Sequence, residues 1–187
     1  MAEPGISMKI VIIGFMGSGK TTVAVQVGKL TGMKVIEMDE LILTSAKRKT
    51  VNELFEKDGE LRFRELEIET AKKIKDMDNV VVSTGGGVVM NKIIIDYLRQ
   101  NNGVIVHLET SFYEIERRLA KEKDKPLFKN VLAARKLYEF RHPLYDFFSD
   151  YMVMTNGKST QQVAHEVVEK LAQDYPIFIK SAKKGNK

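Results

Sequence analysis

The sequence contains no cysteine and no tryptophan, only four prolines among 187 residues, and no long hydrophobic run. Without cysteine the chain can form no disulfide, no thiolate metal site and no cysteine nucleophile. Its apolar stretches are far too short to span a membrane, and its first residues lack the cationic segment of a secretion signal. We therefore expect a cytoplasmic protein. Met8 could be the true start of the chain, with residues 1–7 as an extension.

Positive charge is in small excess and is concentrated at one end. The formal net charge is +5, and leaving out the four lysines of the last eight residues lowers it to +1. A nearly neutral body offers no basic stripe for duplex nucleic acid. Hydrophobic residues make up 43% of the chain, and no repeat or linker divides it. We predict one domain over residues 1–174 and a basic tail over residues 175–187, which we expect to be disordered.

The strongest motif begins at Gly14 and reads Gly-Phe-Met-Gly-Ser-Gly-Lys-Thr-Thr. It fits G-x-x-x-x-G-K-[ST], the phosphate-binding loop, and it lies between a short apolar run and a helical pattern, as that motif requires. The glycines let successive N–H groups turn toward a phosphate, and the following helix adds its N-terminal partial charge. Lys20 is expected to reach the β- and γ-phosphates, and Thr21 to help hold Mg²⁺. The alternative is a glycine-rich turn that binds nothing.

Apolar runs alternate with helical patterns along the rest of the chain. This order predicts βαβ units and a parallel sheet covered on both faces, an α/β fold that binds ligands beyond the carboxyl ends of its strands. The predicted strands are 8–13, 34–37, 79–83, 104–108 and 151–154. The predicted helices are 20–30, 40–46, 50–57, 60–77, 91–100, 111–121, 131–148 with an interruption at Pro143, and 160–172.

Two further unusual stretches follow predicted strands on the same edge of the sheet. Asp39 ends the second strand and is either a polar strand end or an active-site carboxylate; its pairing with Glu37 favours the second interpretation. Three consecutive glycines, Gly85, Gly86 and Gly87, follow the third strand. A simple turn needs fewer, so this run indicates close approach of the backbone to a ligand.

The remaining charged candidates are ambiguous one by one. Arg64 lies in an acidic helix and Arg141 in another helix, and either could form only an exposed ion pair. His107, His142 and His165 are scattered without the spacing of metal ligands, and we interpret them as structural or solvated.

Together, these residues resemble the shikimate kinase family from Lys9 to about Leu171. Order and approximate spacing agree throughout. The motifs are the phosphate-binding loop, Glu37-x-Asp39, Gly59-Glu60-x-x-Phe63-Arg64-x-x-Glu67, Thr84-Gly85-Gly86-Gly87, Leu108-Glu109, Lys125-Pro126-Leu127 and Arg141-x-Pro143-Leu144-Tyr145. The resemblance implies a P-loop NTPase fold of the nucleoside monophosphate kinase type, with five parallel strands flanked by helices on both faces. It also implies a substrate-binding helical region at about 39–68 and a lid at about 122–131.

The family's roles transfer residue by residue as expectations. The catalytic residues would be Asp39, Lys20 and Lys125. The shikimate-binding residues would be Asp39, Arg64, Gly85, Gly86, Gly87 and Arg141. The ATP-binding residues would be Gly17, Ser18, Gly19, Lys20, Thr21, Thr22, Arg118, Lys125 and Thr160, and the Mg²⁺ residues would be Thr21 and Glu37.

Two positions depart from the family pattern. Glu37 stands where the family usually has Asp, and Lys125 stands where its lid usually has Arg. Lysine keeps the charge but loses the planar fork that grips phosphate oxygens, so we expect weaker phosphate clamping.

The implied reaction converts ATP and shikimate to ADP and shikimate 3-phosphate with Mg²⁺, on the pathway to chorismate and the aromatic amino acids. We expect the protein to act as a monomer on small molecules, without nucleic acid or membrane. Paired arginines would also suit a phosphate, so a gluconate or nucleotide kinase of the same fold is one alternative. A nucleotide-binding regulatory protein that has lost turnover is another, because Glu37 and Lys125 depart from the family pattern.

Overall fold

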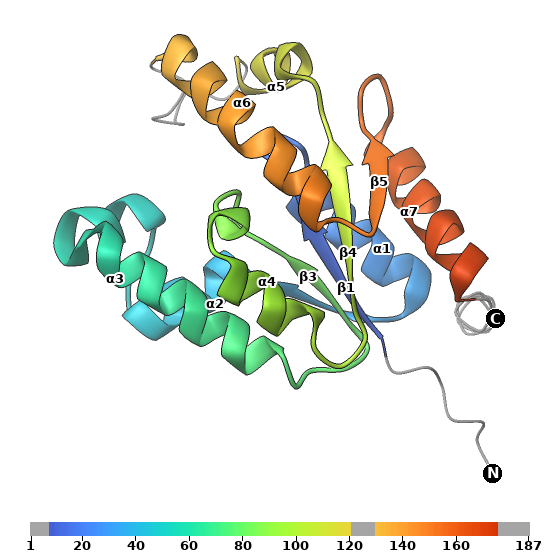
Figure 1. Ribbon diagram of the computed structural model, residues 1–187, viewed down its shortest axis with the longest axis horizontal. Coiled ribbons are helices and arrows are strands. Elements are labelled where there is room, and N and C mark those ends of the chain that lie inside the picture. The colour runs from blue at the N-terminus through green and yellow to red at the C-terminus, as the bar shows by residue number, and fades with distance from the viewer. Residues whose placement is uncertain (1–7, 121–129, 176–187) are drawn as a thin grey trace.

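Strands and helices alternate along the chain as the apolar pattern predicts. The computed structural model describes residues 8–120 and 130–175, which form one sheet covered by helices (Figure 1). The strands are β1 (Lys9–Ile13), β2 (Lys34–Glu37), β3 (Val80–Ser83), β4 (Gly103–Glu109) and β5 (Tyr151–Met154). They lie in the order β2-β3-β1-β4-β5, and every neighbouring pair is parallel. The predicted five-stranded parallel sheet is confirmed.

Helices cover both faces of this sheet. They are α1 (Lys20–Thr31), α2 (Met38–Ala46), α3 (Val51–Ile74), α4 (Lys92–Arg99), α5 (Phe112–Leu119), α6 (Val131–Phe148) and α7 (Thr160–Asp174), with a 3₁₀ turn at η1 (Val88–Met90). Figure 1 shows α1 and α7 on one side of the sheet and α3, α4 and α6 on the other. None of the helices within residues 8–120 and 130–175 is long and apolar enough to cross a membrane.

The side chains of the central strand β1 belong to two separate hydrophobic cores. Successive side chains of a strand point to opposite faces, so its alternate residues divide between the cores. Ile10 and Ile12 pack with α1 and α7, whereas Val11 and Ile13 pack with α3, α4 and α6. All four side chains are fully buried, which explains why residues 10–13 are a continuous apolar run and do not alternate with polar residues.

Polar caps set the beginnings of several helices. Ser111 accepts a hydrogen bond from the Glu114 N–H at the start of α5, as predicted. Ser159 and Gln162 form a reciprocal capping box at the start of α7. These caps orient α5 and α7 toward the loop that follows β1.

The sequence prediction differs from the structure at three points. Asp39 does not end a strand: β2 stops at Glu37, and Asp39 lies in the first turn of α2. Pro143 does not interrupt α6. The helix continues through the proline, and Arg141 and Tyr145 on either side of it both donate hydrogen bonds to the Gly86 carbonyl, which anchors this turn. The η1 turn after the three glycines was not predicted.

The break at Gly59 agrees with the prediction of two successive helices. This residue has φ 83° and ψ 161°, which is not helical, although α3 runs on as one element through Ile74. Residues 1–7, most of the predicted lid at 122–131 with Lys125, and the predicted tail beyond Tyr175 lie outside the described residues.

Candidate active site

The phosphate-binding loop joins β1 to α1. Gly17 and Gly19 have φ of 77° and 91°, a region that residues with a side chain rarely adopt. Gly19 immediately precedes the first turn of α1. The Lys20 ammonium donates a hydrogen bond to the Phe15 carbonyl at 2.9 Å, so its charge lies over the loop. Loop N–H groups, the helix N-terminus and this ammonium together make a site for phosphate.

Two carboxylates, Glu37 and Asp39, face this loop from the junction of β2 and α2. Burial raises the pKa of Glu37, opposed by the hydroxyls of Thr21 and Ser83. Burial also raises the pKa of Asp39, opposed by the charge of Lys20. Glu37 Oε2 and Asp39 Oδ1 are buried and have no hydrogen-bond partner among the described residues. Buried carboxylate oxygens normally have partners, so this pair indicates that ligands complete the site.

Oxygen donors gather where a hard cation would bind. The Thr21 and Ser83 hydroxyls are 3.4 Å apart, and both act on the Glu37 carboxylate. Mg²⁺ takes oxygen ligands, commonly one or two protein side chains with water and phosphate oxygens. Thr21 and Glu37 therefore fit the predicted metal role, and Ser83 adds a hydroxyl that the sequence prediction did not name.

Two of the three glycines lie where a side chain would meet charged groups. A Cβ on Gly85 would come 2.9 Å from Asp39 Oδ1, and one on Gly87 would come 2.8 Å from Arg64 Nη1 and 3.8 Å from Arg141 Nη2. Glycine at these two positions leaves room for the charged side chains beside the backbone. The glycine run therefore brings Asp39, Arg64 and Arg141 together, as the resemblance implies.

Arg64 is held by acidic neighbours on its own helix. It donates to Glu60 at 2.8 Å and to Glu67 at 2.7 Å, so the ion pairs considered as an alternative do form. However, Glu67 is buried, with only 2% of its side chain exposed, and burial raises its pKa. A buried carboxylate orients Arg64 far more firmly than an exposed one, so this pair is not a simple surface salt bridge.

Arg141 reaches the glycines from α6. Its Nη1 donates to the Gly86 carbonyl at 3.3 Å, and the Tyr145 hydroxyl donates to the same oxygen at 2.6 Å. Arg141 Nε is buried without a hydrogen-bond partner among the described residues. Two guanidinium groups thus adjoin Gly87, and one of them has an unsatisfied donor. This arrangement suits a carboxylate or phosphate of a ligand.

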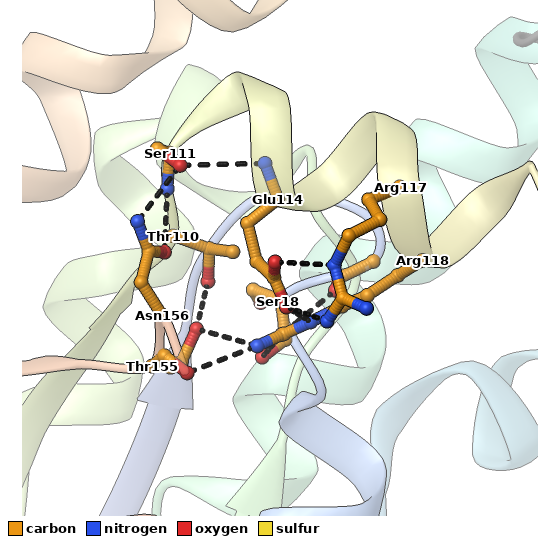
Figure 2. A network of polar contacts seen from close by, with 9 residues as sticks. Ser18, Thr110, Ser111, Glu114, Arg117, Arg118, Thr155 and Asn156 are labelled. Atoms are coloured by element: carbon orange, nitrogen blue, oxygen red, sulfur yellow. Dashed lines mark hydrogen bonds and ion pairs between the residues drawn. The ribbon is translucent and has the colours of Figure 1, made fainter. Parts of the chain in front are cut away.

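A second polar network lies on the other side of the loop (Figure 2). Arg118 Nε donates to Glu114 at 2.8 Å, and its Nη atoms reach the carbonyls of Ser18 at 3.3 Å and Thr155 at 3.0 Å. Hydrogen bonds from Arg117, joined by Arg118, lower the pKa of Glu114 to about 2. Glu114 therefore remains a carboxylate and holds Arg118 between α5, the loop and the segment after β5.

One large cavity lies along the phosphate loop, the two carboxylates and Arg118. Its volume is about 1150 Å³, above the roughly 300–1,000 Å³ usual for a single small ligand. Its lining includes the phosphate-loop residues Gly17, Ser18, Gly19, Lys20, Thr21 and Thr22, the carboxylates Glu37 and Asp39, the glycines Gly85 and Gly86, and Arg118 and Thr160. Arg64 and Arg141 adjoin Gly87, the next residue after the lining glycines.

Besides Ser83 and Glu114, three contributors to the site were not assigned a role from the sequence. Glu67 orients Arg64, Tyr145 fixes the Gly86 carbonyl, and Thr155 receives Arg118. Glu67 follows Arg64 by three residues and Tyr145 follows Arg141 by four, within the family motifs. Residues at these spacings lie on the same face of a helix, so the sequence did contain a signal for both. Thr155 had no such signal, because it meets Arg118 only through the fold.

The structure brings two of the three histidines together, which their spacing along the chain did not indicate. His107 on β4 and His142 on α6 lie close together, with ring centroids 6.0 Å apart, and both contact the carboxylates of Glu109 and Asp146. Burial lowers the pKa of His107. The residues are far apart in sequence, so spacing along the chain could not reveal the cluster. His165 is exposed on α7, as expected.

Comparison with known proteins shows which family the chain belongs to. The shikimate kinase family model matches residues 16–172, which contain most of the chain and, apart from Gly14 and Phe15, the site described above. The chain belongs to the shikimate kinase family. A curated shikimate kinase from Caldanaerobacter subterraneus subsp. tengcongensis is 41% identical over 165 residues, covering 85% of this chain and 93% of the relative. One from Geobacter metallireducens is 31% identical, with 89% and 93% coverage.

Solved structures agree with this family assignment. Shikimate kinase from Acinetobacter baumannii, in complex with shikimate, superposes with a TM-score of 0.83 at 26% identity, covering 91% of this chain and 96% of that one. A gluconokinase from Sinorhizobium meliloti has a TM-score of 0.60 at 16% identity and 91% and 95% coverage, a likeness of fold alone. The shikimate kinase fold and its P-loop class are therefore as predicted.

Proposed function

We propose that the protein transfers the γ-phosphoryl group of ATP to the 3-hydroxyl of shikimate, giving shikimate 3-phosphate and ADP. Membership of the shikimate kinase family supports the reaction. The observation that carries the proposal is the convergence of the phosphate loop, Asp39 and two arginines around Gly85–Gly87. That arrangement has a place for a triphosphate, a place for an anionic acceptor and a carboxylate between them.

The acceptor carboxylate is proposed to bind Arg64 and Arg141. Both guanidinium groups adjoin Gly87, and the partnerless Nε of Arg141 offers a donor that a ligand carboxylate would satisfy. Glu67 keeps Arg64 in place, so the protein has little reorganisation to make when shikimate binds. A gluconate carboxylate offers similar charge, and the family assignment therefore decides between the two acids.

Asp39 is proposed to accept the proton of the attacking hydroxyl. As the new oxygen–phosphorus bond forms and the bond to the ADP oxygen breaks, the hydroxyl O–H bond also breaks, and its proton passes to the carboxylate. The raised pKa of Asp39 brings its basicity closer to neutral pH, and its partnerless Oδ1 provides the acceptor. Gly85 allows this approach because a side chain there would occupy the same space.

The nucleotide is proposed to lie along the phosphate loop toward Arg118 and Thr160. Lys20 would move from the Phe15 carbonyl to the phosphates and stabilise the charge that develops during transfer. Thr21, Glu37 and Ser83 would hold Mg²⁺, directly or through water. When bound, this ion neutralises the β- and γ-phosphate oxygens. Lys125 and the lid, outside the described residues, are proposed to close over the phosphates and exclude water.

The phosphate loop, Asp39, Arg64 and Arg141 converge within the fold of a single chain, which supports our proposal of a monomer as the active unit. We also propose that it works in the cytoplasm, where ATP is available.

The test of the function is ADP formation with shikimate by the wild type and by Lys20→Ala. We expect the variant to lose phosphoryl transfer with its melting temperature unchanged, because the side chain acts on the transition state and lies outside the hydrophobic cores. Near-normal turnover by Lys20→Ala would refute the assignment of the loop.

A further inference from the structure

Two histidines and two carboxylates form a closed cluster between β4 and α6, outside the large cavity. His107 and Glu109 belong to β4, and His142 and Asp146 to α6. None of the four is among the residues that line the cavity. One ligand atom from each of His107, Glu109 and Asp146 lies within 4.8 Å of the other two. Nothing in the proposed phosphoryl transfer uses these groups.

The two carboxylates face opposite edges of the imidazole rings. Asp146 lies on the Nδ1 side of both, with its oxygens 3.0 Å from His107 and 3.4 Å from His142. Glu109 Oε2 lies on the Nε2 side of both, 3.4 Å from His107 and 2.9 Å from His142. Each ring therefore meets a carboxylate oxygen at each of its nitrogens.

One carboxylate oxygen faces both rings. Glu109 Oε2 lies 3.4 Å from His107 Nε2 and 2.9 Å from His142 Nε2, and His107 has only 1% of its surface exposed. The same oxygen is buried and has no hydrogen-bond partner among the described residues. A cation beside it would supply that partner, because imidazole nitrogen and carboxylate oxygen are both metal ligands.

We propose that His107 Nε2, His142 Nε2 and the Glu109 carboxylate bind a divalent transition-metal ion of the Zn²⁺ type. Imidazole with carboxylate suits Zn²⁺, whereas Mg²⁺ and Ca²⁺ prefer oxygen alone. Ligands about 2.0–2.1 Å from a tetrahedral ion lie roughly 3.3–3.4 Å from one another, close to the 3.4 Å between His107 Nε2 and Glu109 Oε2. Asp146 would orient the rings from their Nδ1 side, the arrangement that commonly supports metal-binding histidines.

The ion would tie the substrate-binding turn of α6 to the sheet. His142 follows Arg141, and Asp146 follows Tyr145, whose hydroxyl holds the Gly86 carbonyl. The His107 ring also stacks on Tyr145, with centroids 5.2 Å apart. His142 and Asp146 are 31% and 38% exposed in their side chains, so the ion has a path from solvent. The site is structural, and it is separate from the Mg²⁺ proposed near Thr21.

The test is titration of ZnCl₂ into chelator-treated, tag-free full-length protein without nucleotide or Mg²⁺, measured by calorimetry. We expect one ion per chain in the wild type, loss of binding in His142→Ala, and about 10–100-fold weaker binding in Asp146→Asn. His165→Ala is the matched control, because it removes an exposed histidine of α7 from outside the cluster and should bind as the wild type does. Glu37→Gln should also bind normally, which separates this site from the proposed Mg²⁺ site.

Two results would overturn the proposal. One is a wild type that binds no Zn²⁺, which would mean that protons alone satisfy the cluster. The other is equal binding by His142→Ala and His165→Ala. If His142→Ala does not fold, Asp146→Asn decides, because its shape is unchanged. Kinase activity is measured separately with Mg²⁺ and shikimate, so either result leaves the proposed function standing.

Discussion

Replacing Asp39 by Asn separates a catalytic carboxylate from a structural one. The substitution keeps the size of the side chain and its ability to hydrogen-bond but removes its charge and its basicity. In the structure Asp39 Oδ1 is buried without a hydrogen-bond partner, directly beside Gly85. A residue that served the fold would have its oxygens satisfied, so we expect the variant to lose activity and to keep its stability.

The size of the loss follows from the proposed role. General-base assistance contributes about 10²–10⁴ in rate, so kcat should fall by that factor. At 1.36 kcal/mol for each tenfold change, this corresponds to about 2.7–5.4 kcal/mol of activation free energy. Stability should hold or rise, because burial makes the ionised form of Asp39 unfavourable in the folded protein.

The pH dependence gives the sign of this stability effect. Burial raises the pKa of Asp39 in the folded state above its ordinary value of 3.8. Between the two pKa values the folded protein keeps a proton that the unfolded chain releases, so the free energy of unfolding falls as the pH rises through that window. Below 3.8 the wild type and Asp39→Asn should be equally stable. Above the raised pKa of Asp39, the free energy of unfolding of Asp39→Asn should exceed that of the wild type by its full amount.

The measurements are kcat with shikimate and the melting temperature from acid to neutral pH, the latter without nucleotide or Mg²⁺. Glu40→Gln is the matched control, since Glu40 lies in the same first turn of α2 but is exposed. It should leave both quantities unchanged. Near-normal turnover in Asp39→Asn together with a lower melting temperature would refute the reasoning, because that pattern belongs to a residue that only caps α2.

Four further substitutions probe the arginines beside Gly87 and the nucleotide side of the cavity. Arg64→Ala and Arg141→Ala should each weaken shikimate binding by about 2–5 kcal/mol and leave ATP binding intact; normal shikimate binding by both would place the carboxylate elsewhere. Gly87→Ala puts a Cβ 2.8 Å from Arg64 Nη1, which lies at the end of a flexible side chain, so the fold should survive. The KM for shikimate should rise about tenfold, because Arg64 must move away from its position. An unchanged KM would show that the close contact between Gly87 and Arg64 does not matter for shikimate binding. Arg118→Ala should raise the KM for ATP and not that for shikimate, and the reverse pattern would contradict its assignment to the nucleotide.

The parts of the fold and site that depend on local sequence could be predicted. The phosphate loop needs glycines at fixed spacing between a strand and a helix, and the structure has φ of 77° and 91° at Gly17 and Gly19. The three-glycine run indicated close backbone approach, and a Cβ at Gly85 or Gly87 would indeed collide with Asp39 or Arg64. A buried strand can also be predicted from a continuous apolar run, as in residues 10–13 of β1.

The parts of the fold and site that depend on contacts between residues far apart in the sequence could not be predicted. Nothing near Pro143 shows that α6 continues, because the anchoring oxygen belongs to Gly86 on another element. His107 and His142 are 35 positions apart, and only the packing of α6 on β4 brings their rings together. The sequence places Asp39 at a strand end because no capping residue marks the start of α2: Glu37 precedes this helix without a side-chain capping hydrogen bond.

The most direct test of the account is the choice of acceptor. Purified protein is incubated with ATP and Mg²⁺, and steady ADP formation is measured with shikimate, with gluconate and with a nucleoside monophosphate. We predict sustained turnover with shikimate and only background ADP with the other two. Turnover that prefers gluconate or a nucleotide would contradict the proposed function, and ATP binding without turnover on any acceptor would indicate a regulatory protein.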